Sequence, residues 1–367
     1  MQREIRKLIE RFQVEGRFSQ AHPIESGHIH DSWRVTCRKT QLKYRYVLQR
    51  INHDIFRKPE EVMENITRVS RHLRARLESE GFSDLERRYL QVVPTLEGET
   101  FYRDEEQQYW RVYEFIENAR SYDTVQSRDH AYEAARAFGN FLAQMDSMPG
   151  PALHETIPGF LSGVPRYAAL LEAVKDDAVG RCDSARGEIA FALERESIVL
   201  IPPRLEAECV IFRRVTHNDC KINNVMMDHD TGEALCVIDL DTVMPGLVIY
   251  DFGDLVRTAA CPAAEDEKDL TRMELELPLF QALLEGYRDG AGAALSQAEV
   301  NQLGFAGKYM AYLHVLRFLT DYLRGDIYYK TDYPQQNLDR CRTQIALVRS
   351  METQRDNIAA IVRNYTP

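Results

Sequence analysis

The spacing of apolar residues changes along the chain, from alternation in the first third to a helical repeat in the rest. Residues 109–116 alternate apolar and polar side chains, and residues 44–51 are rich in β-branched and aromatic residues, so both segments are predicted to be strands. Apolar residues in 2–13 have helical spacing, and acidic residues after Pro59 mark the start of a second helix.

Helical spacing dominates from residue 127 onward, for example in 131–145. The pattern therefore predicts an α+β protein. We place a small antiparallel β-sheet lobe with helices at residues 1–116 and a larger, mostly helical lobe at residues 117–367. Residues 175–190 are charged and small, and are predicted to form a mobile connection.

Composition narrows the class of protein. A chain of 367 residues exceeds the usual size of a single core, which agrees with two lobes. A net charge of −11 argues against a nucleic-acid partner. No apolar run reaches 18 residues, so no membrane span is expected. The seven cysteines form no Cys-x-x-Cys pair, which favours reduced thiols and a cytoplasmic protein. We expect a monomer or a weak homodimer.

The segment 217–224 carries the pattern His-x-Asp-x-x-x-x-Asn, and Asp239 follows an apolar run after it. Phosphotransferases of the kinase type place a catalytic base and two magnesium ligands in this order. We therefore expect Asp219 to accept the proton of the attacking hydroxyl, and Asn224 and Asp239 to hold Mg²⁺ on ATP phosphates. The pattern alone would arise by chance in roughly a few in a hundred chains of this length.

The surrounding residues predict a hairpin that makes the pattern more specific. Residues 224–228 and 234–238 are apolar runs, and the turn between them contains a glycine. Antiparallel pairing would set Asn224 opposite Ile238 or Asp239, at ~5 Å. Two oxygen-bearing side chains would then meet at one end of the hairpin, which suits Mg²⁺.

Neighbouring residues extend the predicted catalytic site. Lys221 lies where kinase catalytic loops carry a lysine that contacts the transferred phosphate, and His217 is expected to orient the loop. The Asp-Phe-Gly tripeptide at 251–253 is not interpreted as the metal motif, because Asp239 already occupies that place. Asp251 is instead expected to cap a helix and tether the catalytic loop.

The N-terminal third offers candidate nucleotide-binding residues. Gly27 lies in a predicted turn that would cover the ATP phosphates. The following strand has no lysine at the position of the usual phosphate clamp and offers Gln49 or Arg50 instead; Arg50 keeps the positive charge. Glu64 or Glu61, on the helix that starts near Pro59, could pair with that cation, and Glu64 is preferred because it lies one turn further into the helix.

Two further sets of residues complete the prediction. The backbone of Glu114, Phe115 and Ile116 is expected to hydrogen-bond adenine at the junction between the lobes. Arg317 and Asp321 lie four residues apart on a predicted helix and therefore on one face, where they would bind the acceptor or form an ion pair. Asp241 would support the metal, add a metal contact or touch the acceptor.

Several of these segments resemble the aminoglycoside phosphotransferase and choline kinase superfamily of small-molecule kinases. The resemblance extends over nearly the whole chain, and its narrower signals resemble kinases that phosphorylate N-acetylhexosamines at the anomeric hydroxyl. It implies a protein-kinase-like two-lobed fold, ATP and Mg²⁺ as cofactors and a small sugar as substrate. The segments that carry it are 27–32, 46–52, 63–66, 110–113, 155–160, 216–224, 237–254 and 317–326.

Other interpretations of the same residues stay open. The same chemistry on homoserine, choline, fructosamine or an aminoglycoside is the first alternative; mixed charges in the C-terminal helices weigh mildly against the polycationic aminoglycosides. A nucleotide-binding pseudokinase is the second, supported only by the atypical Gly27 turn and the missing strand lysine. A metallohydrolase that uses His217 ranks last, because no second histidine stands at ligand spacing.

Overall fold

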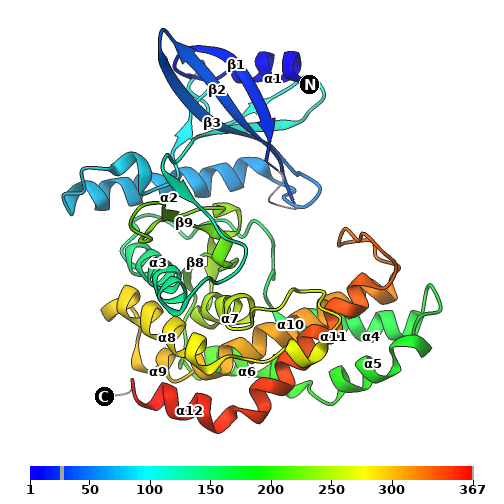
Figure 1. Ribbon diagram of the computed structural model, residues 1–367. Coiled ribbons are helices and arrows are strands. Elements are labelled where there is room, and N and C mark those ends of the chain that lie inside the picture. Colours follow the sequence, from blue (N-terminus) through cyan, green and yellow to red (C-terminus); the bar gives the residue numbers. More distant parts are fainter. Residues whose placement is uncertain (25–28, 366–367) are drawn as a thin grey trace. The chain divides into compact units, whose positions relative to one another are not determined.

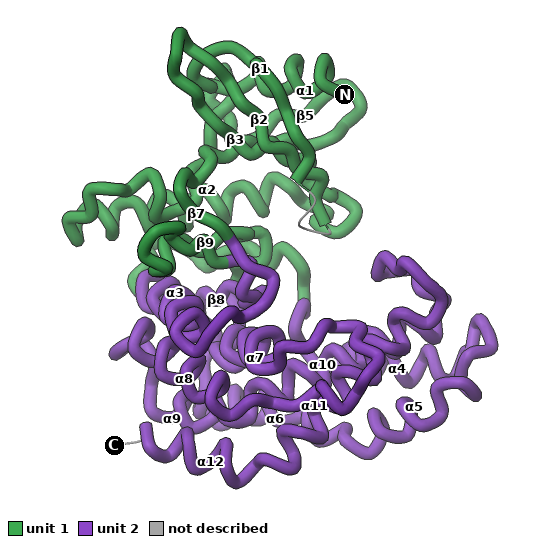
Figure 2. Tube along the Cα trace, in the orientation of Figure 1, with its two compact units in different colours: residues 1–120, 147–158, 225–244 green, residues 121–146, 159–224, 245–367 purple. Residues whose placement is uncertain are grey.

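The structure is a computed structural model that describes residues 1–24 and 29–365. It divides into two compact units (Figure 2). Unit 1 comprises residues 1–120, 147–158 and 225–244, and unit 2 comprises residues 121–146, 159–224 and 245–367. The hairpin predicted after the catalytic loop thus belongs to the same compact unit as the N-terminal sheet.

Unit 1 is built on an antiparallel sheet whose described strands follow the order β1-β2-β3-β6-β4, with β5 paired to β6. The glycine-containing segment 25–28 between β1 and β2 lies outside the described residues. Unit 1 contains α1 (Gln2–Ile9), β1 (Arg17–Pro23), β2 (Asp31–Lys39), β3 (Leu42–Ile51), α2 (Pro59–Ser79), η1 (Leu85–Arg87), β4 (Val92–Val93), β5 (Tyr102–Arg103), β6 (Tyr109–Glu114), β7 (Ala119–Arg120), β9 (Val225–Asp228), β10 (Ala234–Val237) and the 3₁₀ turn η4 (Leu240–Thr242).

The two faces of this sheet differ in what they bury. Ile5 and Ile9 of α1 pack with Tyr46 and Leu48 of β3 and with Val112 of β6 in one apolar cluster. Successive residues of a strand point to opposite faces, so the residues between these positions project from the other face. That other face carries the polar side chains described below.

The hairpin of β9 and β10 has the predicted form. Its strands pair antiparallel, with Val237 opposite Val225 at the open end and an irregularity between Ala234 and Cys236. Asn224 immediately precedes Val225, and Asp239 stands two residues after Val237. The ladder ends at Val225 and Val237, the residues next to Asn224 and Ile238, and the position of Asn224 opposite Ile238 or Asp239 stays a prediction.

Unit 2 is mostly helical, and the long helix α10 lies at its centre, between α4, α7 and α11 (Figure 1). The strand β11 (Met244–Gly246) leads into this unit. The remaining elements are α3 (Arg128–Asp146), α4 (Gly163–Asp176), η2 (Asp183–Ala185), α5 (Arg186–Leu193), α6 (Ser197–Ala207), β8 (Arg214–Thr216), η3 (Ile222–Asn224), α7 (Val248–Ala259), η5 (Leu270–Arg272), α8 (Leu277–Ala291), η6 (Gly292–Ala294), α9 (Gln297–Val300), α10 (Leu303–Leu323), α11 (Gln336–Thr353) and α12 (Arg355–Arg363).

The Asp-Phe-Gly tripeptide lies inside α7 and explains part of this packing. A Cβ atom on Gly253 would lie 2.4 Å from the carbonyl oxygen of Ala306, so a glycine is needed where α7 crosses α10. Phe252 is buried beside the rings of Phe280 and Tyr287. Two of the three residues thus serve helix packing, as expected if the tripeptide is not the metal motif.

The α+β prediction is confirmed, with an antiparallel sheet region first and a mostly helical remainder. The prediction of a mobile connection at residues 175–190 is wrong, since η2 and the start of α5 lie there. Ala185 and Ile189 are buried in this segment, so its low apolar content misled the prediction. Among the described residues, no helix is long and apolar enough to cross a membrane.

Candidate active site

The predicted catalytic base stands in a loop of unit 2 between β8 and η3. Lys221 Nζ lies 2.8 Å from Asp219 Oδ1 and 3.2 Å from Oδ2. The Asn224 side-chain amide donates to the Asp219 carbonyl oxygen at 2.9 Å and to Oδ2 at 3.1 Å. The structure thus brings three of the predicted residues, Asp219, Lys221 and Asn224, into direct contact.

These contacts set the ionisation of the pair. Burial acts to raise the pKa of the Asp219 carboxyl, but the charge of Lys221 and the hydrogen bonds from Lys221 and Asn224 outweigh it and place this pKa below its usual range. Burial acts to lower the pKa of Lys221, and the carboxylate of Asp219 reverses that effect. Both side chains are therefore charged at neutral pH, as a proton acceptor and a phosphate contact require.

The loop is anchored from α7 by Asp251. Its Oδ2 accepts the His217 backbone N–H at 2.9 Å, and its Oδ1 accepts the Asn218 N–H at 2.7 Å. The predicted tether is confirmed, but the predicted helix cap is wrong: Asp251 lies inside α7, and the residue before the helix is Leu247. Burial raises the pKa of Asp251 to about 6, against the lowering effect of the two backbone donors.

The approach to the loop is sterically tight and locally strained. A Cβ atom on Gly246 would lie 2.2 Å from Thr216 Oγ1 and 2.4 Å from Asn218 Oδ1, so only glycine fits there. Asn218 has φ 63°, in the left-handed region that asparagine tolerates better than most residues. Backbone strain of this kind persists where the surroundings hold it, often at functional sites.

His217 is buried and lies edge-on to two rings of α3. Its ring centroid is 5.3 Å from that of Phe138 and 5.7 Å from that of Phe141, and its side chain is fully shielded from solvent. A buried imidazole among phenyl rings is suited to fixing a loop. This position agrees with the expected orienting role.

Unit 1 holds the second predicted metal ligand. Asp239 is exposed, has φ 61° and stands directly before η4. Two residues later Asp241 is buried, with about 1% of its surface exposed. The two aspartates of the Asp-Leu-Asp run thus have opposite environments, which their spacing alone did not reveal.

Asp241 forms a buried ion pair with Arg111 of β6. Arg111 Nη1 and Nη2 each donate to one carboxylate oxygen at 2.7 Å, and Arg111 is also about 1% exposed. His30 Nδ1 accepts the Asn52 N–H at 3.0 Å, which leaves its Nε2 as the protonated nitrogen, 3.5 Å from Asp241 Oδ1. Burial opposes ionisation of Asp241, but Arg111 and His30 hold its pKa well below the usual range.

Gln49 stands at the strand position of the usual clamp lysine and bonds to this arginine. It is directly opposite Arg111 in the β3–β6 ladder, and its Oε1 accepts from Arg111 Nε at 3.0 Å. Arg50, the next residue, points to the opposite face and forms an ion pair with Asp31, and both side chains are about half exposed. The structure thus separates Arg50 from the polar face that Gln49 and Arg111 share.

The other predicted nucleotide residues lie in unit 1 with their own partners. Glu64 Oε2 lies 3.0 Å from His154 Nε2. The backbone N–H of Glu114 donates to the Gln91 carbonyl, and that of Phe115 to the Arg45 carbonyl. Of the three predicted adenine contacts, only Ile116 has an N–H that donates to no described residue of unit 1. Gly27 lies outside the described residues.

The predicted acceptor residues of α10 do not pair with each other. Asp321 accepts the backbone N–H groups of Ile327, Tyr328 and Tyr329 at 2.8–3.0 Å, and the Asn337 amide at 2.9 Å. Its two oxygens therefore hold the loop that follows α10. The Arg317 guanidinium instead lies over aromatic rings.

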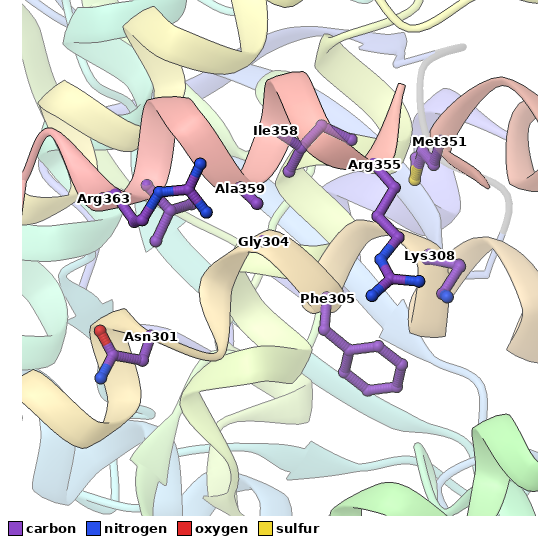
Figure 3. A pocket seen from close by; sticks show the side chains of 10 residues that line it. Asn301, Gly304, Phe305, Lys308, Met351, Arg355, Ile358, Ala359 and Arg363 are labelled. Carbon is purple, nitrogen blue, oxygen red and sulfur yellow. The ribbon is translucent and has the colours of Figure 1, made fainter. Parts of the chain in front are cut away.

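A separate groove of about 390 Å³ runs between α10 and α12 in unit 2 (Figure 3). Phe305 and Lys308 line it from α10, and Arg355 and Ile358 line it from α12. None of the predicted site residues lies in its wall.

Sequence analysis missed Arg111, which holds Asp241. A signal was present: an arginine interrupts the apolar strand 109–116, and a charged residue is rarely buried unless it is paired. Its partner is 130 residues away in the chain, a separation that local patterns do not span.

Solved structures share this fold at low sequence identity. An aminoglycoside phosphotransferase from Alicyclobacillus acidocaldarius has TM-score 0.56 and 13% identity, with 98% of this chain and 96% of that chain covered. A spectinomycin phosphotransferase solved with ADP and spectinomycin has TM-score 0.56 and 12% identity, with coverages of 96% and 98%. A choline kinase from Cryptosporidium parvum has TM-score 0.55 and 13% identity, with coverages of 95% and 93%. The predicted protein-kinase-like fold is therefore confirmed.

The sequence itself matches the phosphotransferase enzyme family over residues 20–294. The match includes the sheet of unit 1, the catalytic loop and the β9–β10 hairpin, and it spans about three quarters of the chain. We conclude that the chain belongs to the phosphotransferase enzyme family.

Proposed function

We propose that this protein is a small-molecule kinase that transfers the γ-phosphate of ATP to the anomeric hydroxyl of an N-acetylhexosamine, as an N-acetylhexosamine 1-kinase does. The observation that carries the chemistry is the charged pair of Asp219 and Lys221 on a loop tethered by Asp251. Family membership supports phosphoryl transfer, and the resemblance of segments 238–246 and 317–326 supports the sugar.

In the proposed step Asp219 accepts the proton of the anomeric hydroxyl while that oxygen bonds to the γ-phosphorus. The bond from the γ-phosphorus to the oxygen of ADP breaks, and ADP leaves. Lys221, 2.8 Å from Asp219 Oδ1, supplies positive charge near the phosphoryl group. Positioning and electrostatics carry most of the rate in such transfers.

Asn224 and Asp239 are the proposed Mg²⁺ ligands. Because the Asn224 amide nitrogen donates to Asp219, its Oδ1 is the atom left for a cation. No group of three or more His, Cys, Asp or Glu side chains in the described residues could hold a metal alone. A site with two protein oxygens fits Mg²⁺, which usually takes one or two carboxylates and completes its shell with phosphates and water.

For the nucleotide we propose the backbone of Glu114, Phe115 and Ile116 at adenine, with Ile116 N–H as the available donor. Gly27 would cover the phosphates. Arg50 and Glu64 stay candidates for the phosphate side. The face that carries Gln49 and Arg111 is the other candidate, because Gln49 stands in the lysine register.

The experiment is an ADP-release assay with Mg²⁺-ATP across N-acetylglucosamine, N-acetylgalactosamine, glucose, homoserine, choline and kanamycin. We expect turnover on the N-acetylhexosamines and an acid-labile phosphate product. Turnover on choline, homoserine or kanamycin alone would support the proposed kinase activity and contradict the proposed sugar substrate. No turnover on any acceptor would support the nucleotide-binding pseudokinase.

A further inference from the structure

Two arginines of unit 2 converge on Phe160, and one of them had no assigned role. The Arg317 guanidinium carbon lies 5.3 Å from the Phe160 ring centroid. Arg166, on α4, donates from Nη2 to the Phe160 carbonyl oxygen at 3.2 Å. Both side chains are half-buried.

Most of the other half-buried or buried arginines of the unit have a carboxylate partner; Arg288, which lies over the Tyr365 ring, is an exception. Arg257 lies 2.8 Å from Asp254, Arg342 lies 2.6 Å from Glu188, and Arg181 lies 2.5 Å from Asp326. Among the described residues of unit 2, neither Arg166 nor Arg317 has a carboxylate within 4.0 Å. The buried Nε of Arg166 also has no hydrogen-bond partner. Buried charges normally have partners, so donor capacity is left over here.

The surroundings of the pair are aromatic and uncharged. The Tyr329 ring centroid lies 5.5 Å from the Arg317 guanidinium carbon, and Asp321 fixes the backbone that carries this ring. Arg317 Nη1 lies 3.4 Å from His314 Nε2, while His314 Nδ1 donates to the Met310 carbonyl. Burial and the charges of Arg257 and Arg317 hold the pKa of His314 well below its usual range, so it is neutral.

Helix packing connects this cluster to the catalytic loop. Arg317 is on α10, which packs against α7, and Asp251 of α7 accepts the backbone N–H groups of His217 and Asn218 in that loop. Burial and the charge of Arg317 lower the pKa of Arg166, a cost that a bound oxygen group would offset. The cluster therefore has the donors, the flat walls and the position of an acceptor subsite.

We infer that Arg166 and Arg317 together form a subsite for a planar oxygen-bearing substituent of the acceptor, an amide carbonyl or a carboxylate. Guanidinium groups present several N–H donors in a fixed plane and bind such oxygens well. An ammonium group in the same place would be repelled, which disfavours polycationic acceptors. This inference depends on the proposed function in one respect: it takes the ligand of the subsite to be the phosphoryl acceptor.

The test is equilibrium calorimetry of the full chain without ATP, using N-acetylglucosamine, glucuronate, glucose and glucosamine. We expect N-acetylglucosamine or glucuronate to bind at least about tenfold more tightly than glucose, and glucosamine most weakly. Arg166→Met and Arg317→Met should remove this preference, and Arg166→Lys should restore part of it. Arg186→Met, whose side chain is largely exposed, is the matched control, and circular dichroism checks that each variant is folded.

The outcomes separate the two hypotheses. Binding of glucuronate but not N-acetylglucosamine, with loss in Arg166→Met, would retain the subsite and count against the proposed sugar. Unchanged affinities in a folded Arg166→Met, or glucose binding as tightly as the other sugars, would overturn the subsite. Absence of binding by every sugar in the panel would overturn it as well.

Discussion

The catalytic loop of unit 2 and the Arg111–Asp241 pair of unit 1 both contain a pair of opposite charges, but the charges are partly exposed in the loop and buried in the pair. The partners also lie at very different separations along the chain. Asp219, Lys221 and Asn224 contact one another within six residues. Arg111 and Asp241 are 130 residues apart and meet only because β6 and the segment after β10 fold into one unit. The loop contacts can be predicted from a local sequence motif. The Arg111–Asp241 pair can be recognised only once the fold is known.

The difference predicts different responses to substitution. In the proposed reaction the loop residues act on the reacting groups, so their loss should reduce turnover and leave stability nearly unchanged. A buried, fully bonded ion pair should show the opposite response, because removing one partner strands the other charge.

The largest effect should come from Asp219→Asn. Loss of the base is expected to lower kcat about 10³-fold, since general bases contribute ~10²–10⁴, while ATP affinity stays the same. Asp183→Asn, an exposed aspartate of the same unit, is the control in the ADP-release assay. Turnover within tenfold of the wild type would remove Asp219 from the mechanism.

Arg111→Met should destabilise the protein by about 3–5 kcal/mol, because Asp241 would be left buried and charged. Urea unfolding would measure this loss. The double variant Arg111→Met/Asp241→Leu removes both charges and should recover much of it. Arg45→Met, which breaks an exposed pair of the same sheet, should cost only ~0–1 kcal/mol. Equal losses of unfolding free energy in Arg111→Met and Arg45→Met would show that the buried pair contributes no more to stability than an exposed pair.

Asp251→Asn tests the tether, with an expected loss of about 10–100-fold in kcat. The asparagine side chain can accept from only one of the two backbone donors without turning its own N–H₂ toward the other. Lower free energy of unfolding without any change in kcat would show that the tether serves only stability.

The same aspartate predicts the acid side of the pH profile. Its folded pKa, about 6, exceeds its ordinary value of 3.8, so its contribution to stability is full below pH 3.8 and is lost as pH rises through about 6. The ionised form that accepts both N–H groups is present above pH 6, so kcat should fall as pH drops below about 6. Asp219, with its lowered pKa, would place the fall below pH 4 instead. Measurement of kcat from pH 4 to 8 distinguishes the two.

The smallest effect is expected from Arg50→Met. Because Arg50 forms an exposed pair with Asp31 on the face opposite Gln49, its loss should change the KM for ATP by less than about threefold. A rise of tenfold or more would show that Arg50 contacts phosphate.

Individual residues show which features of the structure could be predicted from the sequence. The β9–β10 hairpin and the Asp251 tether were predictable because a turn glycine, two apolar runs and a familiar motif lie within a short stretch of chain. The partner of Asp241 was not, since pairing of a strand residue with a distant segment leaves no local pattern. Arg166 escaped notice for a related reason: its significance depends on the lack of a carboxylate among the described residues of unit 2, a property of packing alone.

The most direct test of the central claim is ³¹P NMR of the wild-type protein and Asp219→Asn incubated with Mg²⁺-ATP and N-acetylglucosamine. We predict that the wild type produces ADP and a phosphate signal coupled to the anomeric proton, and that the variant produces neither on the same timescale. A phosphate on another sugar oxygen, or equal product from the variant, would contradict the proposed reaction.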